Sequence, residues 1–188
     1  HQRVRRQRQM CIRDRNTSSK TKLDRKASQL TVLLVVNHFV MVIIMAATPL
    51  HVQDIGENIQ VVGTIISYHT LGMFVFSPIL GRFVDKVGSK KVSITGGFIL
   101  LISCVCALNT SDIVLLHLSL FLLGLGWNFN FVSISSEISK YSIEKNTNLN
   151  IKSDSFVFVG SVFAQSSLGL TYTLIGFEGL VIFCLLYT

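Results

Sequence analysis

The chain has 188 residues, of which 49% are hydrophobic and only 14% are charged, and its formal net charge is +7. Its apolar runs carry no interior charge and leave no amphipathic stripe on which a water-soluble core could pack, which argues against a soluble helical domain. The positive charge does not indicate a nucleic-acid partner either, because residues 1–15 alone contribute +5, from six arginines and Asp14.

The two ends of the chain differ in character from the middle. Residues 1–15 resemble the translated read-through of a sequencing adapter, and residues 184–188 resemble its counterpart, so we interpret both as non-native and leave them out of the fold. The alternatives for the arginine run are a polybasic arm for anionic lipid or nucleic acid, and an inert tail. Residues 16–29 are interpreted as a polar, cytoplasmic lead-in.

Five segments are apolar enough to cross a membrane, because about 20 apolar residues in a helix span a hydrocarbon core of about 30 Å. They are residues 30–50, 60–80, 92–109, 113–135 and 154–174. A sixth begins at Leu180 and has nine residues before the sequence stops, too few to span. The sequence therefore predicts an all-α, polytopic transmembrane helix bundle over residues 30–183 with a truncated sixth helix.

The lysines and arginines after residue 15 fall only in every second connection. By the positive-inside rule, the N-terminus of the bundle is then cytoplasmic, in a plasma membrane or a bacterial inner membrane. The eleven residues are Lys20, Lys22, Arg25 and Lys26 before the first span, Arg82, Lys86, Lys90 and Lys91 after the second, and Lys140, Lys145 and Lys152 after the fourth.

The connection between the second and third spans carries a motif, Gly81 to Lys91. It resembles G-x-x-x-D-[RK]-x-G-x-[RK]-[RK], which follows the second and the eighth helix in the major facilitator superfamily. The matching residues are Gly81, Asp85, Lys86, Gly88, Lys90 and Lys91. The alternative is an ordinary basic loop that contains two glycines.

Asp85 is a lone carboxylate among cations at the membrane surface. It could receive a cation or the positive end of a helix. Contacts of that kind hold one face of a carrier closed and break when the carrier opens, so the motif is predicted to take part in gating.

Three further stretches resemble the C-terminal six helices of a bacterial-type branch of the same superfamily, namely residues 45–50, 69–74 and 123–129. The resemblance implies helices seven to eleven and the start of twelve, a missing N-terminal six-helix half as partner, and a small solute carried by alternating access. The strongly basic motif departs from relatives of that half, so assignment to the N-terminal half remains an alternative.

The topology agrees with this implication. Three spans followed by three of opposite direction are the arrangement of an inverted repeat, which secondary transporters use. No residue-level similarity links the two triplets, so the topology permits a repeat without establishing one. The third span has no charge, histidine or amide between Val92 and Leu108 and is predicted to face lipid.

Polar side chains inside the spans are the candidates for a substrate or proton path, because such groups are costly in hydrocarbon. His69 could exchange a proton or share a hydrogen bond with a neighbouring helix. Asn37 and His38 point about 100° apart and cannot both face one cavity. Asn128 and Gln165, like Asn130, could bind a substrate or fasten helices, and Trp127 could stack on a substrate, join the interfacial belt or pack.

Catalysis, metals and cofactors are not indicated. The sequence has no H-E-x-x-H, no G-x-S-x-G and no carboxylate pair, and Cys104 and Cys106 have no acidic or histidine partner nearby. The expected partners are the lipid bilayer and a small solute, with no nucleic acid. A channel or a structural six-helix membrane protein is the alternative to a carrier, and a membrane-embedded enzyme is less favoured.

Overall fold

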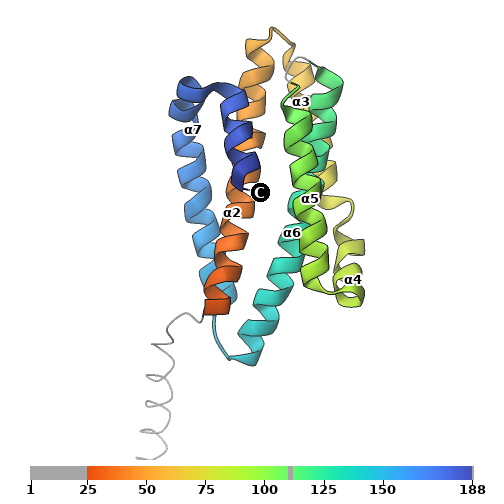
Figure 1. The fold of residues 1–188 in the computed structure, drawn as a ribbon, viewed down its shortest axis with the longest axis vertical. Coiled ribbons are helices and arrows are strands. Elements are labelled where there is room, and N and C mark those ends of the chain that lie inside the picture. Colours follow the sequence, from red (N-terminus) through yellow and green to blue (C-terminus); the bar gives the residue numbers. More distant parts are fainter. Residues whose placement is uncertain (1–24, 110–111, 188) are drawn as a thin grey trace, which may run out of the picture.

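The computed structural model describes residues 25–109 and 112–187, and every regular element in that part of the chain is a helix (Figure 1). Residues 1–15 and most of the expected lead-in lie outside the described residues. The helices are α2 (Arg25–Asp54), α3 (Ile59–Phe74), α4 (Ser77–Val87), α5 (Ser89–Ala107), α6 (Ile113–Glu144) and α7 (Leu149–Tyr187).

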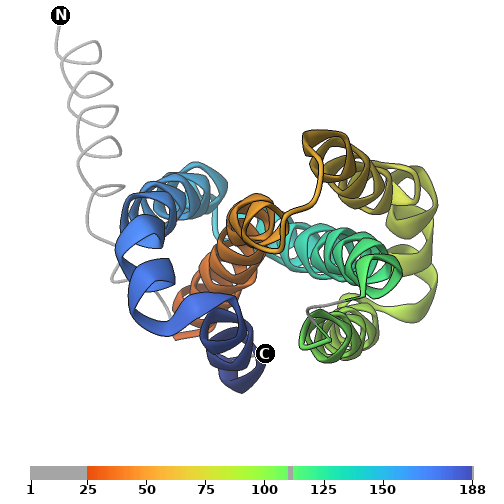
Figure 2. The same ribbon diagram turned by 90° about the horizontal axis from the view of Figure 1, so that it is seen from above.

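Five helical stretches in the described residues are long and apolar enough to cross a membrane, when α3 and α4 are taken together. Seen from above, α2 and α6 lie at the centre of the bundle, with α7 on one side and α3, α4 and α5 on the other (Figure 2). The predicted all-α transmembrane bundle is therefore confirmed.

The helices extend beyond the apolar segments from which they were predicted. α2 runs over 25–54 rather than 30–50, and α6 continues to Glu144 rather than ending near residue 135. Hydropathy marks only the part of a helix that lies in hydrocarbon, whereas backbone hydrogen bonds continue the helix into the polar interface.

The second span is interrupted. α3 ends at Phe74, and α4 starts at Ser77 with Pro78 in its first turn, where the missing proline N–H is tolerated. α4 then continues to Val87, so most of the expected loop from Gly81 to Lys91 is helical instead. The reversal is made at Gly88, whose φ of +93° lies in the region that favours glycine.

α7 contains a second reversal, at Gly176, where φ is +66° and ψ is −176°. The residues after it run back beside α2 (Figure 1). This returning segment buries Phe177, Leu180, Val181 and Cys184 in the main hydrophobic cluster. At the same end, the Phe177 ring stacks on His51 with ring centroids 4.3 Å apart, and the Tyr172 hydroxyl donates to Asp54 over 2.5 Å.

α6 makes two close crossings through glycines. A Cβ added to Gly124 would overlap the carbonyl oxygen of His69 on α3, and a Cβ on Gly72 would overlap that of Phe121. On the opposite side, a Cβ on Gly126 would lie 3.0 Å from the carbonyl oxygen of Gly96 on α5. Small residues of this kind let helix backbones approach closely in a membrane.

The prediction that the third span faces lipid holds for only one side of α5. Ile94, Phe98, Ile102 and Val105 are exposed on that side. The other side packs on α6, where Ser103 and Ser119 each donate to the other's carbonyl oxygen over 2.8 and 2.9 Å. The span lacks charges and amides, but its serines and glycines suit a tight helix contact as well as a lipid surface.

The two ends of the bundle carry opposite charge. All described lysines and arginines lie at the end formed by the start of α2, the α4–α5 turn and the α6–α7 connection, which we call the basic end. The other end, which we call the acidic end, has no described lysine or arginine. It holds Asp54, Glu57, Asp112 and Glu178.

The crossing of α3 and α6 leads to a stability prediction. Gly124→Ala should lower the free energy of unfolding by about 1–3 kcal/mol, because the added methyl group meets backbone that has no side-chain freedom to move aside. The measurement is equilibrium unfolding in mixed detergent micelles. Gly63→Ala is the matched control, since nothing lies within 4 Å of a Cβ added at that position. Equal loss in the two variants would contradict the close crossing.

Candidate functional site

A chain of hydrogen bonds joins three helices inside the bundle. Ser93 on α5 donates to Asn130 Oδ1 on α6 over 2.9 Å, and Asn130 Nδ2 donates to Asn37 Oδ1 on α2 over 3.2 Å. Asn37 Nδ2 in turn donates to the carbonyl oxygen of Trp127 over 3.4 Å. The two amides satisfy each other where water is scarce, which fixes the facing sides of α2, α5 and α6.

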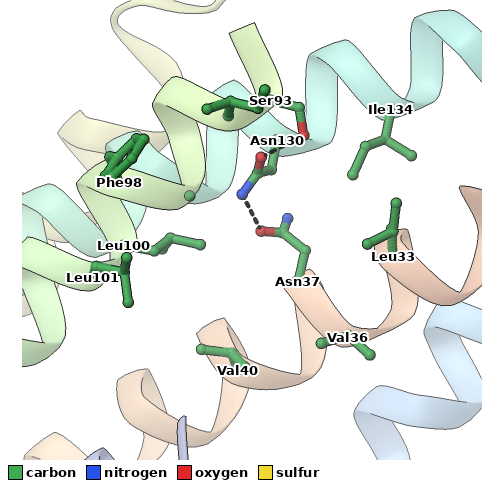
Figure 3. A pocket seen from close by; sticks show the side chains of 12 residues that line it. Leu33, Val36, Asn37, Val40, Ser93, Phe98, Leu100, Leu101, Asn130 and Ile134 are labelled. Atoms are coloured by element: carbon green, nitrogen blue, oxygen red, sulfur yellow. Dashed lines mark hydrogen bonds between the residues drawn. The ribbon is translucent and has the colours of Figure 1, made fainter. Parts of the chain in front are cut away.

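This network borders a cavity of about 340 Å³ between the same three helices (Figure 3). Leu33, Val36 and Val40 line it from α2, and Phe98 and Leu101 from α5. Asn37 and Asn130 point toward each other at its wall, and the rest of the lining is mostly apolar. A cavity of this size with few polar groups has the general form of a small-molecule site.

The structure separates the consecutive residues Asn37 and His38. Asn37 faces the cavity, whereas His38 lies against the Trp127 ring, with centroids 5.6 Å apart. Trp127 is 7% exposed and stacks on Phe131 at 4.7 Å, so this indole packs between helices rather than lying in an interfacial belt. In the described part of the chain, His38 Nδ1 and Trp127 Nε1 have no hydrogen-bond partner.

His69 lies at the close crossing of α3 and α6 and is 1% exposed. Its Nδ1 is 3.0 Å from the carbonyl oxygen of Leu120, which can only accept, so Nδ1 carries the hydrogen. Nε2 of the neutral ring is then a bare acceptor, and it has no partner among the described residues. This side chain therefore makes the interhelical hydrogen bond that one of the two interpretations of His69 expects, and it keeps a second nitrogen open.

The other candidates occupy two different environments. Asn128 is 2% exposed, and its Oδ1 accepts from Ser77 over 3.1 Å, while its Nδ2 has no partner in the described chain. Gln165 lies on an exposed part of α7. The fold thus gathers Asn37, His38, His69 and Asn128 around α6 and leaves Gln165 apart from them on α7.

The motif of the α4–α5 turn lies on the surface of the basic end. The Asp85 side chain is exposed and forms no hydrogen bond or ion pair with the described residues. Lys86, Lys90 and Lys91 are also exposed, and a Cβ added to Gly81 would have nothing within 4 Å. The motif is therefore free to meet another element at this surface.

Sequence reasoning missed Glu137 as the acidic contact at this end. Its carboxylate accepts from Ser89 over 3.0 Å and lies 3.6 Å from Lys26 Nζ, so it ties the starts of α5 and α2 to α6. The sequence does show a carboxylate just past the end of an apolar span. Hydropathy alone, however, does not indicate which residues that carboxylate contacts. The ion pair is partly exposed and contributes little by itself.

No group of three or more histidine, cysteine or acidic side chains that could hold a metal ion occurs in residues 25–109 and 112–187. Cys104 and Cys106 form no disulfide there, and Cys104 is buried on α5. The described residues offer hydrogen-bonding groups beside a mostly apolar cavity.

The chain is similar in sequence to known membrane transporters. The family model described as Major Facilitator Superfamily matches residues 30–188. Two curated relatives from Bacillus subtilis (strain 168), the uncharacterized MFS-type transporters YdeG and YddS, are 37% and 36% identical over 54% of this chain. The riboflavin transporter RfnT of Brucella anthropi is 24% identical over 70% of it.

The chain spans about a quarter of the length of YdeG and YddS, with 24% of each covered, and 33% of RfnT. No solved structure matches the chain significantly.

The amide network leads to a coupling prediction. In a double-mutant cycle of Asn37→Ala and Asn130→Ala, the two changes should be non-additive by about 1 kcal/mol in unfolding free energy. The reason is that either substitution alone already breaks the hydrogen bond between the two amides. The control cycle pairs Asn37→Ala with Thr95→Ala, whose hydroxyl bonds its own helix at Lys91, and should be additive. Additivity in both cycles would mean that the network is not formed.

Proposed function

Because this chain belongs to the Major Facilitator Superfamily, we propose that it moves a small solute across a membrane by secondary active transport with alternating access. The family assignment makes it a multi-pass integral membrane protein whose function is transport rather than catalysis. The observation that carries the proposal is the family match over residues 30–188, together with unpaired polar groups at the helix crossings.

The chain is proposed to supply one six-helix half of the carrier, and a second half of the same protein is its partner. Support comes from the relatives, of which the matched region is only a quarter to a third. In such carriers a solute binds near the midplane between two repeats that rock about it. Counterflow by the complete carrier would distinguish this function from that of a channel.

The basic end is proposed to be cytoplasmic, in a bacterial inner membrane or a plasma membrane. The described chain places Arg25 and Lys26 together with the cations of the α4–α5 turn and the α6–α7 connection at this end. Short connections rich in lysine and arginine stay on the cytoplasmic side.

The solute and proton path is proposed to follow the open polar atoms around α6. His38 Nδ1, His69 Nε2 and Asn128 Nδ2 lack partners in the described residues, and a buried polar atom without a partner is costly unless a ligand or another element meets it. Asn37 adds the polar wall of the cavity. Gln165 is proposed to join this path from α7 when the second half is in place.

The α4–α5 turn is proposed to be a gate. Exposed Asp85 would meet a cation or a helix end of the partner half when the basic end is closed and lose that contact when it opens. Gly81 allows a close approach, Gly88 makes the reversal, and Lys86, Lys90 and Lys91 complete the charged surface.

Reconstitution tests the proposed transport. The complete carrier in proteoliposomes should show saturable uptake and counterflow, with riboflavin as the first solute to try because the relative RfnT is a riboflavin transporter. The 188-residue chain alone should show neither, since the proposed second half would supply the other wall of the site. Saturable uptake by the chain alone would contradict the proposed half-carrier.

A charge substitution tests the gate. In the complete carrier, Asp85→Asn should slow uptake at least about tenfold, the effect expected when a contact of about 1.4 kcal/mol is lost. The thermal stability should hardly change, because the Asp85 side chain is exposed and forms no hydrogen bond or ion pair with the described residues. Asp154→Asn, another exposed carboxylate at the basic end, is the control and should transport normally. Equal uptake by both variants would remove Asp85 from the gate.

A further inference from the structure

A second histidine on α6 lies outside the site described above. His117 is half-buried five residues into α6, near the acidic end, on the side that packs against α3. Its Nδ1 is 2.7 Å from the carbonyl oxygen of Ile113, and its Nε2 is 2.9 Å from the hydroxyl of Thr64 on α3. The Tyr68 ring meets it edge-on, with centroids 5.4 Å apart.

Two carbonyl oxygens in this cluster can only accept, which restricts where its hydrogens lie. The Ile113 carbonyl can only accept, so Nδ1 carries a hydrogen. The Thr64 hydroxyl has a single hydrogen and lies 2.8 Å from the carbonyl oxygen of Val61, another pure acceptor. If the hydroxyl donates to Val61, Nε2 must carry a hydrogen as well, and the ring is then the imidazolium.

The neutral ring requires a different arrangement. With Nε2 bare, the Thr64 hydroxyl must turn away from Val61 and donate to Nε2, or two lone pairs would face each other over 2.9 Å. The cluster therefore has two hydrogen-bonded states that differ by one proton on Nε2 and by the direction of one hydroxyl. Only in the protonated state do all of these hydrogen bonds form at the same time.

We propose that His117 and Thr64 form a proton-binding site near the acidic end of the carrier. The proton comes from hydronium in the bulk solution. The proton adds to the Nε2 lone pair, and the Thr64 hydroxyl turns from Nε2 to the carbonyl of Val61. No covalent bond breaks in the protein. The coupling ion of the carrier is then a proton, and this part of the inference rests on the proposed function.

The charged and titratable groups around the site favour a cation there. α3 contributes Tyr68, and α6 contributes Asp112, whose carboxylate accepts from the N–H groups of Val114 and Leu115. Glu57 lies at the same end, which has no lysine or arginine in the described chain. α5 carries Cys104 and Cys106, but it packs on the opposite side of α6, because His117 and Ser119 point about 200° apart.

The position of the site gives it a role that His69 alone cannot fill. His69 lies on the same seam between α3 and α6, because it bonds Leu120, less than one turn beyond His117. His69 is fully buried, whereas Thr64 and Tyr68 are exposed. A proton that arrives at the acidic end meets His117 first. His117 is therefore the first proton acceptor, and His69 is a second acceptor deeper in the bundle.

Nitrogen NMR of the ring tests the site directly. The full chain, labelled with ¹⁵N-histidine and placed in lipid nanodiscs, should show His117 with both nitrogens protonated at low pH. At high pH it should show the Nδ1–H tautomer with Nε2 bare. His117→Gln assigns the signals. A neutral Nε2–H tautomer, or a ring that never binds a second proton, would overturn the proposal.

Two matched threonine variants test the role of the hydroxyl. Thr64→Val keeps the shape of the side chain but removes the acceptor for Nε2–H, so the doubly protonated ring loses a hydrogen bond and its Nε2 signal and pH transition should change, because hydrogen bonds to charged groups are the stronger ones. Thr70→Val, whose hydroxyl bonds only Ile66 of its own helix, should leave the transition in place. Equal behaviour of the two variants would overturn the assigned role of Thr64.

Transport provides the second arm. In the complete carrier, His117→Gln should abolish the stimulation of uptake by an imposed pH gradient while leaving counterflow, which needs no net proton movement. If the variant keeps the wild-type response to the gradient, the coupling role is wrong even if the NMR result stands. If no carrier activity is found at all, the proposed function fails, whereas the NMR measurement still decides the proton site.

Discussion

Polar groups in hydrocarbon must find their partners inside the protein, and this constraint organises the whole bundle. α6 meets it on two sides. Through Gly124 it comes close enough to α3 for His69 to bond the carbonyl of Leu120, and through Gly126 it comes close enough to α5 for Ser103 and Ser119 to bond each other's backbone. Without these close crossings, the buried hydroxyl and imidazole groups would lose partners that lipid cannot replace.

The same constraint shows where function is to be sought. Most buried polar side chains around α6 are paired, as the Ser93–Asn130–Asn37 chain illustrates. A few atoms are not, and His69 Nε2 and Asn128 Nδ2 are among them in the described residues. A carrier needs groups that are incompletely satisfied in one state and satisfied in another, since a ligand shifts an equilibrium only through contacts that differ between states. We propose that unpaired atoms such as His69 Nε2 and Asn128 Nδ2 serve transport.

The sequence predicted the fold class well, because hydropathy and the charge pattern both report directly on the bilayer. It located the helices less well at their ends, as α6 shows by continuing to Glu144, since interfacial helix turns carry no apolar signal. The sequence identified the interior polar residues as candidates, but it did not show which of them face a cavity and which pack between helices. Asn37 and His38 are neighbours in sequence and face different surroundings, and Trp127 proved to be a packing residue, because pairing depends on which helix faces which. The roles of Glu137 and His117 appear only once Ser89 and Thr64 are brought beside them.

α6 holds α5 against it by direct contact between the two helix backbones within the membrane. Oxidative cross-linking of Ser103→Cys with Ser119→Cys, in a chain with its native cysteines replaced by alanine, measures this contact in native membranes. Each serine hydroxyl lies within 2.9 Å of the other residue's carbonyl oxygen, so the pair should form a disulfide rapidly and the linked peptides should appear by mass spectrometry. Val105→Cys with Ser119→Cys should not link, because Val105 is 54% exposed on the far side of α5. Linking of the Val105 pair but not of the Ser103 pair would mean that α5 does not turn this face to α6.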